Sequence, residues 1–264
     1  MRRKYLLLLF LSSASPLRAS HPTPTDGKVQ THWFFEQKGR RFRHQGSADL
    51  LSWRLGGEYE FASGPGLGIS LAGQRAQAGG GSQASLGDTS LHLKLPLPDW
   101  EREDLTVDSV LGLGLGLPTG DEARGLGSGH PELTPFASLA LEKEAFRLHG
   151  GISGLFSLDG SEHSEDENLA DPHADRELRA RLALGFGGKS GYLDAGLAAA
   201  LPLSGHHKGD LFLTARPELA RALGRGWVAA LFGELPLSSL RRFEYEAGLQ
   251  FRKRFGRPEK GPNP

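Results

Sequence analysis

The sequence predicts an all-β protein, specifically a transmembrane up-and-down antiparallel β-barrel of about 12 strands. Most of the chain divides into segments of about 10 to 15 residues in which apolar and polar side chains alternate. The chain begins with a segment typical of exported proteins, and the connections between the alternating segments are by turns long and short. Side chains point alternately to the two faces of a strand, so a membrane barrel places one set in lipid and the other inside.

The N-terminus has the layout of a secretory signal peptide, which we assign to residues 1–19. Arg2, Arg3 and Lys4 form a basic start, and an unbroken apolar run, 5–11, follows them. Small and polar residues come next, and cleavage after Ala14 or Ala19 fits the pattern. The apolar run is too short to cross a bilayer as a helix, which needs about 20 residues. We therefore expect an exported protein whose mature part is one barrel domain, 20–264.

Composition fits an envelope protein and argues against several other classes. Lys plus Arg and Asp plus Glu both number 31, so no net charge points to nucleic acid as a partner. There is no cysteine, which excludes a disulfide scaffold and a lipid-anchored cysteine. Beyond the signal, the best apolar stretch, 195–203, is short and contains a proline. We therefore expect no membrane-spanning helix, whereas strands with one apolar face remain compatible with this composition.

Twelve alternating segments are predicted as strands. They are 28–37, 48–62, 65–76, 85–97, 104–117, 131–143, 145–158, 176–187, 190–203, 209–221, 225–237 and 240–255. Strands of soluble proteins average about 5 or 6 residues, whereas a tilted membrane strand needs about 9 to 11. The length of these segments therefore favours a membrane barrel.

The last segment shows the alternation most clearly. Its apolar positions are Phe243, Tyr245, Ala247, Leu249, Phe251 and Phe255, and its polar positions are Arg242, Glu244, Glu246, Gly248, Gln250, Arg252 and Arg254. An Arg or Lys facing lipid at the bilayer midplane costs about 2–4 kcal/mol, so the charged positions are expected to face the lumen. Over all segments, the candidate lumen-lining residues are Arg54, Glu58, Glu60, His92, Lys94, Arg147, His149, Arg179, Arg181, Arg216, Glu218, Glu244, Glu246 and Arg252.

The connections are expected to be long at one end of the barrel and short at the other. With the N-terminus in the periplasm, the outer loops are 38–46, 77–84, 118–130, 159–175, 204–208 and a short tip near 236–239. The periplasmic turns are 63–64, 98–103, 143–144, 188–189 and 222–224. Trp33, Trp53, Trp100 and Trp227 lie near segment ends, which is compatible with an interfacial aromatic girdle and equally with four core tryptophans.

A family resemblance is carried by three short motifs. They are Gly87-Asp88, Leu117-Pro118-Thr119-Gly120-Asp121 and the stretch 126–129, Leu-Gly-Ser-Gly. With the strands around them, they resemble the bacterial outer-membrane β-barrel family associated with transport and with the phenol meta-degradation pathway. The resemblance covers about a fifth of the chain. It implies an outer-membrane channel for small hydrophobic or aromatic compounds and supplies no catalytic residues.

The end of the chain resembles the C-terminal signal that the barrel-assembly machinery reads. Gly248, Phe251 and Phe255 match its glycine and alternating aromatic residues. Lys253 stands where an apolar residue is usual, and nine residues follow Phe255. The expected partners are therefore outer-membrane lipid, the assembly machinery and an unidentified small permeant.

No motif predicts an enzyme, a cofactor or a metal site. Ser153 and His149 share one strand face but would lie about 13 Å apart at ~3.3 Å per residue, which is too far for base activation of the serine. The loop 159–175 contains five carboxylates and two histidines without a fixed Ca²⁺-ligand spacing, and a solvated loop is favoured there. His206 and His207 could likewise add metal ligands, but solvated histidines are favoured there.

Two rival interpretations remain open. A closed barrel without a pore would serve adhesion or envelope integrity, and it predicts that Arg179 and Arg181 pair with Glu244, Glu246 or Glu58 across the lumen. A soluble periplasmic β-sandwich would bury the apolar faces in a core. The three interpretations place the same side chains in different surroundings.

Overall fold

The computed structural model describes residues 31–42, 48–62, 64–78, 81–98, 100–102, 105–124, 126–159, 174–188 and 190–255. The predicted signal peptide lies outside the described residues. The strands are β1 (His32–Phe42), β2 (Ala48–Glu60), β3 (Gly66–Ala78), β4 (Gly81–Leu86), β5 (Thr89–Pro96), β6 (Trp100–Arg102), β7 (Leu105–Leu117), β8 (Glu132–Lys143), β9 (Phe146–Ser157), β10 (Arg176–Gly188), β11 (Gly191–Pro202), β12 (Phe212–Gly224), β13 (Trp227–Pro236) and β14 (Tyr245–Arg254). A short 3₁₀ helix, η2 (Glu122–Arg124), lies between β7 and β8.

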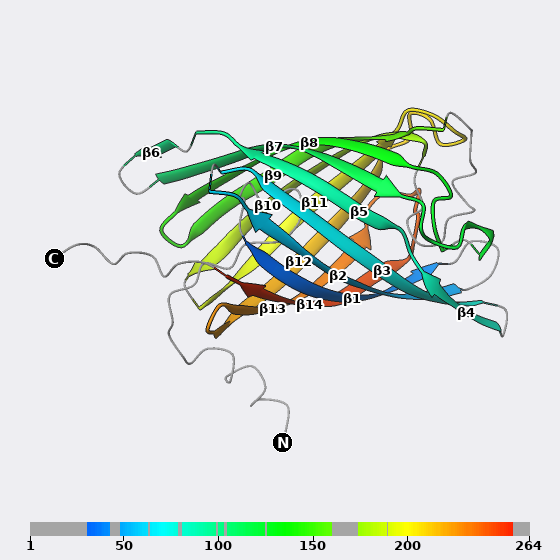
Figure 1. The fold of residues 1–264 in the computed structure, drawn as a ribbon, viewed down its shortest axis with the longest axis horizontal. Helices are drawn as coiled ribbons and strands as arrows, with labels where there is room; N and C mark the ends of the chain where they lie inside the picture. Colours follow the sequence, from blue (N-terminus) through cyan, green and yellow to red (C-terminus); the bar gives the residue numbers. More distant parts are fainter. Residues whose placement is uncertain are drawn as a thin grey trace, which may run out of the picture.

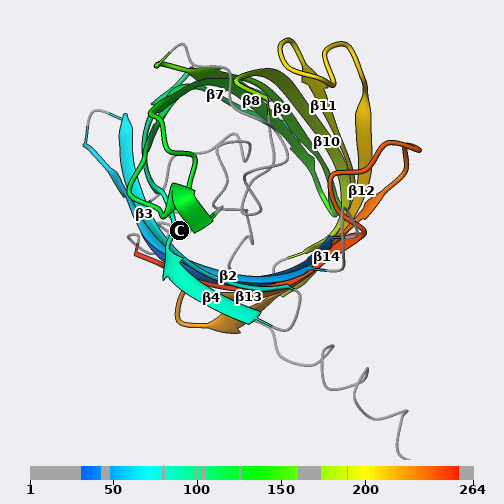
Figure 2. The same cartoon turned by 90° about the vertical axis from the view of Figure 1, so that its right-hand side faces the viewer.

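The sheet closes on itself through antiparallel pairs between sequence neighbours (Figure 1). The first strand pairs with the last, and the seam runs from His32 opposite Arg254 to Arg41 opposite Tyr245. Two short strands add no place to the wall: β4 continues the line of β5 along β3, and β6 pairs only with the start of β7. The result is the predicted closed antiparallel barrel of twelve strands, seen end-on in Figure 2.

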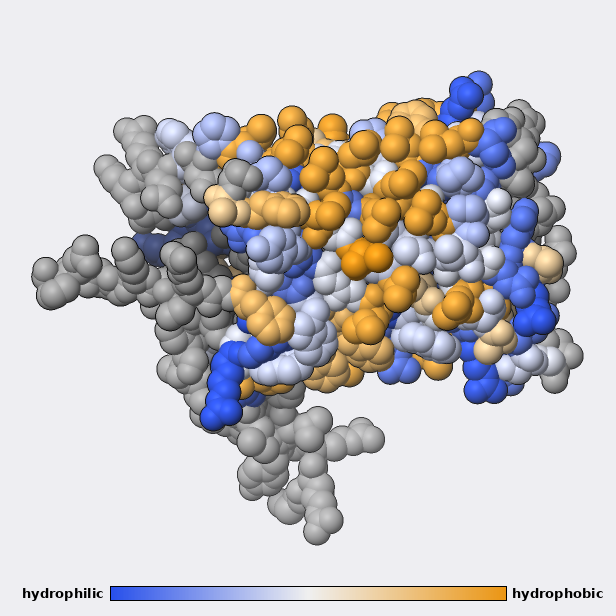
Figure 3. All heavy atoms as spheres, in the orientation of Figure 1, coloured by the Kyte–Doolittle hydropathy of each residue, from blue (hydrophilic) through white to orange (hydrophobic). Residues whose placement is uncertain are grey.

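The outer surface of the barrel is apolar around its middle. Leu55, Leu71 and Leu182 are more than half exposed, and many other leucines share that face. On the face drawn in Figure 3, apolar side chains form a band with more hydrophilic side chains toward its ends. Exposed apolar surface of this extent would cause aggregation in water, whereas hydrocarbon solvates it. The soluble sandwich is therefore wrong, because it requires these side chains to be buried in a core.

The short connections lie at the end of the barrel where the first strand begins and the last one ends, and we call this the termini end. The β12–β13 turn has two residues, Arg225 and Gly226, and both have positive φ angles, 49° and 82°. Two consecutive residues with positive φ form a type I′ turn, and the twist of this turn matches the right-handed twist of the two strands that it joins. At this end Trp33 packs edge-on against Trp227, with 4.9 Å between ring centroids, and Phe146 meets Phe186 at 5.8 Å.

The opposite end, which we call the loop end, carries the long connections but departs from the prediction in three places. β1 continues to Phe42, so the predicted loop 38–46 is shorter. The predicted loop 77–84 is mostly a hairpin of β3 and β4. The β13–β14 connection, 237–244, is longer than predicted, because β14 begins only at Tyr245. Phe243, predicted on the lipid face, instead packs against a buried apolar cluster at this end.

Among the described residues, no helix has the length and apolar content needed to cross a membrane.

Candidate functional site

The inner face of the barrel holds the charged side chains in small clusters of opposite sign. The carboxylate of Glu58 on β2 lies 2.9 Å from both His92 Nε2 and Lys94 Nζ on β5. These strands are not neighbours, because β3 lies between them. Gly68 of β3 makes the contact possible, since a Cβ there would lie 2.1 Å from the His92 ring. The two partners offset the free energy that the Glu58 carboxylate loses when it is removed from water.

A second cluster lies on the seam where the first and last strands meet. Glu246 of β14 lies 2.7 Å from Arg40 Nη2 and 3.3 Å from Lys38 Nζ, both on β1. Further along the seam, the Gln250 amide donates a 3.1 Å hydrogen bond to Glu36. These contacts join the two ends of the strand order, so they stabilise the closed form of the sheet.

A third cluster occupies the inner face of β9 to β12. The His149 Nε2 atom lies 3.0 Å from Asp194 Oδ2, and the Tyr192 hydroxyl donates to Glu218 at 2.8 Å. The Arg147 guanidinium lies 5.4 Å from the centroid of the Tyr192 ring. His149, predicted as a lumen-lining residue, is thus held by a carboxylate on the barrel wall.

The arginines of β10 and β12 pair with carboxylates close to their own strands. Arg179 Nε donates to Glu177 at 2.6 Å, and Arg242 from the β13–β14 connection also bonds Glu177. Arg216 Nη1 lies 3.5 Å from Glu234 on the next strand. The closed-barrel rival predicted Glu244, Glu246 or Glu58 as the partner of Arg179, whereas the structure shows Arg179 bonded to Glu177.

The structure places the predicted lumen-lining residues as follows. The buried ones are Glu58, Lys94, Arg147, His149, Glu218, Glu246 and Arg252; the half-buried ones are His92, Arg179, Arg181, Arg216 and Glu244; and the exposed ones are Arg54 and Glu60. Except for Glu244, they lie on the strand positions that alternate with the exposed leucines. Glu244 precedes β14 and lies at the loop end, 3.6 Å from Arg41.

Several inner residues with central contacts were absent from the predicted set. They are Glu36, Lys38, Arg40, Glu177, Tyr192, Asp194 and Glu234. Glu177 shares the parity of the predicted inner residues Arg179 and Arg181, whereas no inner residue was predicted on the strand that carries Asp194. Lys38 and Arg40 belong to β1 and not to a loop, because this strand extends beyond its predicted end at residue 37.

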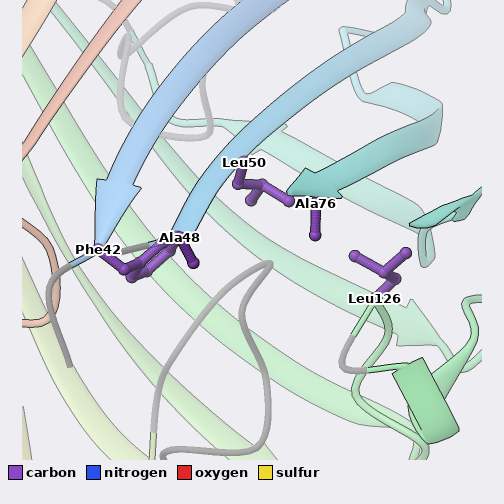
Figure 4. Packing of buried hydrophobic residues seen from close by; sticks show 5 residues of the cluster. All are labelled: Phe42, Ala48, Leu50, Ala76 and Leu126. Carbon is purple, nitrogen blue, oxygen red and sulfur yellow. The ribbon is translucent and has the colours of Figure 1, made fainter. Parts of the chain in front are cut away.

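An inward loop narrows the barrel at the loop end. It comprises residues 118–131, of which 125 is not described, and its short green helix lies inside the ring of strands in Figure 2. Leu126 is fully buried in a cluster with Phe42, Ala48, Leu50 and Ala76, on the inner face of β1 to β3 (Figure 4). Burial of a leucine side chain contributes about 1.5–3 kcal/mol, so this contact anchors the loop to the wall.

The Asp88 carboxylate fastens both ends of the inward loop. Its Oδ1 atom accepts the Gly120 N–H at 2.9 Å, and its Oδ2 atom accepts the Ser128 N–H at 2.6 Å. The two loop ends pass so closely that a Cβ on Gly120 would lie 2.5 Å from the carbonyl oxygen of Leu126. The three motifs that carried the family resemblance therefore form one structural unit, with the first holding the other two.

An arginine-lined pocket of about 320 Å³ extends from the β13–β14 connection into the barrel. Its lining includes the arginines Arg40, Arg179, Arg181, Arg216, Arg241 and Arg242, and one carboxylate, Glu234. We call it the arginine pocket. Its volume lies in the range of small-molecule sites, about 300–1,000 Å³.

The predicted metal-binding alternatives concern two loops. Residues 160–173 of the acidic loop lie outside the described residues. In the other loop, His207 Nδ1 lies 3.0 Å from Asp210 Oδ2. Within the described part of the chain, no group of three or more His, Asp or Glu side chains is arranged to hold a metal ion.

Comparisons with solved structures place this architecture among outer-membrane barrels. An outer-membrane channel from Pseudomonas putida F1 superposes with a TM-score of 0.66 at 13% identity, covering 92% of this chain and 100% of that one. The KdgM porin gives 0.52 at 11% identity, covering 85% and 99%. The β domain of the Bordetella autotransporter BrkA gives 0.51 at 13% identity, covering 86% and 100%. At these identities the likeness is one of fold.

No family model and no curated protein matches the sequence.

Proposed function

We propose that the protein is an outer-membrane channel that admits small molecules. The observation that carries this proposal is a closed barrel with an apolar outer band, a charged inner face and a pocket that continues inward from the loop end. The Pseudomonas putida channel and the KdgM porin have the same barrel architecture. Export by the N-terminal signal and insertion by the assembly machinery, which would read Gly248, Phe251 and Phe255, belong to the same proposal.

The pairing pattern favours a channel over a plugged structural barrel. Glu58 and Glu246 have partners on the same or a nearby part of the wall, and Arg179 is held by Glu177 on its own strand. The residues that compensate these charges therefore belong to the wall beside them, and Arg54 is exposed on the inner face of β2. A plug would instead join opposite walls.

The substrate class that we propose is small molecules with an apolar or aromatic body. The inner face is not uniformly polar, because Val110, Phe136, Leu155 and Phe232 are buried there among the charged residues. A further apolar patch of the inner wall joins β11 to β13 and includes Val228. Mixed walls of this kind suit solutes that carry one polar group on an apolar frame.

Planar-bilayer recording on the refolded full-length protein tests the channel. We expect discrete conductance steps, and uptake of small aromatic solutes into proteoliposomes faster than uptake of sugars of the same size. An Arg54→Gln variant should change ion selectivity, because Arg54 is exposed inside. Absence of conductance together with unchanged uptake after deletion of the gene would refute the channel and favour the structural barrel.

A further inference from the structure

The geometry of the arginine pocket points to a binding site for a small organic carboxylate. This inference rests on the proposed channel and narrows its substrate class to molecules that join an anionic group to an apolar body. It concerns Arg181 and Arg216, whose inner-face positions lie on either side of β11.

The floor of the pocket is low because β11 presents only small side chains between the two arginines. Arg181 lies opposite Ala198 on β11, and Ala198 in turn lies opposite Thr214 on β12. Arg216 lies opposite Gly196. Adjacent strands are about 4.8 Å apart, so β10 and β12 are separated by roughly 9–10 Å with only alanine and glycine between them. This forms a trough bounded by one arginine on each side.

Neither guanidinium is fully paired within the described part of the chain. The Nε and Nη2 atoms of Arg181 and the Nε atom of Arg216 are buried and have no hydrogen-bond partner there. Buried donors without partners cost about 1–3 kcal/mol each, and more when they are charged. Such an arrangement is stabilised when a ligand supplies the missing acceptors.

Three carboxylates act electrostatically on Arg181, and each of them also contacts another side chain. Glu218 accepts from the Tyr192 hydroxyl at 2.8 Å, Asp194 contacts His149 at 3.0 Å, and Glu234 accepts from the Thr214 hydroxyl at 2.8 Å. The largest charge effect on Arg181 comes from the like-charged Arg216. Arg216 is partly compensated by Glu234 at 3.5 Å, but buried donors of both guanidinium groups have no acceptor, and a carboxylate matches the planar fork of arginine.

The rest of the pocket suits the apolar part of such a ligand. Phe212 and Phe243 contribute to its lining, and the Arg242 guanidinium stacks 4.4 Å from the Phe212 ring centroid. Arg216 is likewise held 4.5 Å from the Phe232 ring centroid. Because these aromatic rings already restrict the arginine side chains, less conformational entropy is lost when a ligand binds.

Calorimetric titration of the full-length protein in detergent tests the site, with benzoate, benzamide and acetate as probes. Benzoate and benzamide have the same ring, but only benzoate is charged, so we expect benzoate to bind at least about ten-fold more tightly. We expect acetate to bind more weakly than benzoate, because it lacks the apolar body. Equal binding of benzoate and benzamide would overturn the proposal, and acetate binding as tightly as benzoate would overturn its apolar part.

Variants separate this site from general charge effects. Arg181→Gln should weaken benzoate binding about ten-fold or more and remove the preference over benzamide. Arg75→Gln removes the same charge near the loop end of β3, where Arg75 is exposed and bonds Ser82, and should leave binding unchanged. Arg216→Gln repeats the test if Arg181→Gln fails to fold, as judged by heat-modifiable migration. Retention of the benzoate preference in the folded variant would contradict the inference.

The outcome is distinguishable from failure of the channel itself. If the protein conducts but does not prefer benzoate, the arginine pocket is not a carboxylate site while the channel stands. If benzoate binds selectively but no conductance or uptake is found, the site stands and the channel proposal fails.

Discussion

Release of the inward loop by a substitution at Asp88 offers a direct measure of what holds the loop in place. Asp88→Ala removes the two hydrogen bonds from Gly120 and Ser128. Hydrogen bonds to a charged group contribute about 1.5–3 kcal/mol each, and we take the low end because Asp88 is only half-buried. The docked loop should therefore lose about 3 kcal/mol relative to the released loop.

Trypsin cleavage after Arg124 reports the released state. Arg124 lies in η2 within the loop, and cleavage requires local opening of the segment around it. When opening and closing are fast, the cleavage rate follows the open population, so about 3 kcal/mol corresponds to a roughly 100-fold faster cut. The fragments are identified by mass spectrometry after digestion of the folded protein.

The control for this experiment is Asp210→Asn in the β11–β12 connection. The Asp210 carboxylate contacts His207 and lies outside the inward loop. This substitution should leave cleavage after Arg124 unchanged. Both variants should retain heat-modifiable migration, which shows that the barrel is folded. Cleavage of the Asp88→Ala variant at the wild-type rate would show that Asp88 does not hold the loop, and the hydrogen-bond reasoning would be wrong.

Two further predictions concern the wall of the barrel. Gly68→Ala should lower the free energy of unfolding by about 1–3 kcal/mol, because the new methyl group would overlap the His92 ring; Gly39→Ala, where a Cβ meets nothing within 4 Å, is the control. Denaturant titration in detergent measures both, and equal midpoints would contradict the close approach. Leu182→Arg, in the apolar band, should cost about 2–4 kcal/mol in lipid, whereas Leu178→Arg near the loop end should cost about 0–1 kcal/mol. Equal costs in vesicle-based unfolding would mean that the depth assigned to these residues is wrong.

The strands can be predicted because a two-residue alternation of polarity shows both where a strand runs and which side chains face lipid. Each of the twelve predicted segments overlaps a strand of the barrel wall, and Leu182 and Arg181 lie on opposite faces as expected. The ends of the strands were less predictable. A strand that continues into water, as β1 does beyond Gln37, is no longer required to be apolar on its outer face, so its sequence resembles a loop.

The partners of the inner charges could not be predicted from the sequence. Alternation places Glu58 and His92 inside but does not reveal that Gly68 lets their side chains meet across β3. The inward loop was missed for a different reason. Its position depends on a buried leucine and on hydrogen bonds from Asp88 to backbone groups, and neither feature gives a periodic pattern. The family resemblance identified the residues of this unit without indicating what they do.

The pairing of β1 with β14 has a consequence for how the chain folds. The hydrogen bond from Arg40 to Glu246 joins residues 206 positions apart, whereas every other neighbouring pair of wall strands is contiguous along the chain or nearly so. Non-local pairing is slow, because chain entropy is lost before any contact compensates for it. Until that last pairing forms, two long strands present unpaired backbone groups, which favour association with other chains. We therefore expect ring closure to be the step at which nascent molecules partition between insertion and aggregation, with Glu246 as the charge that draws the ends together.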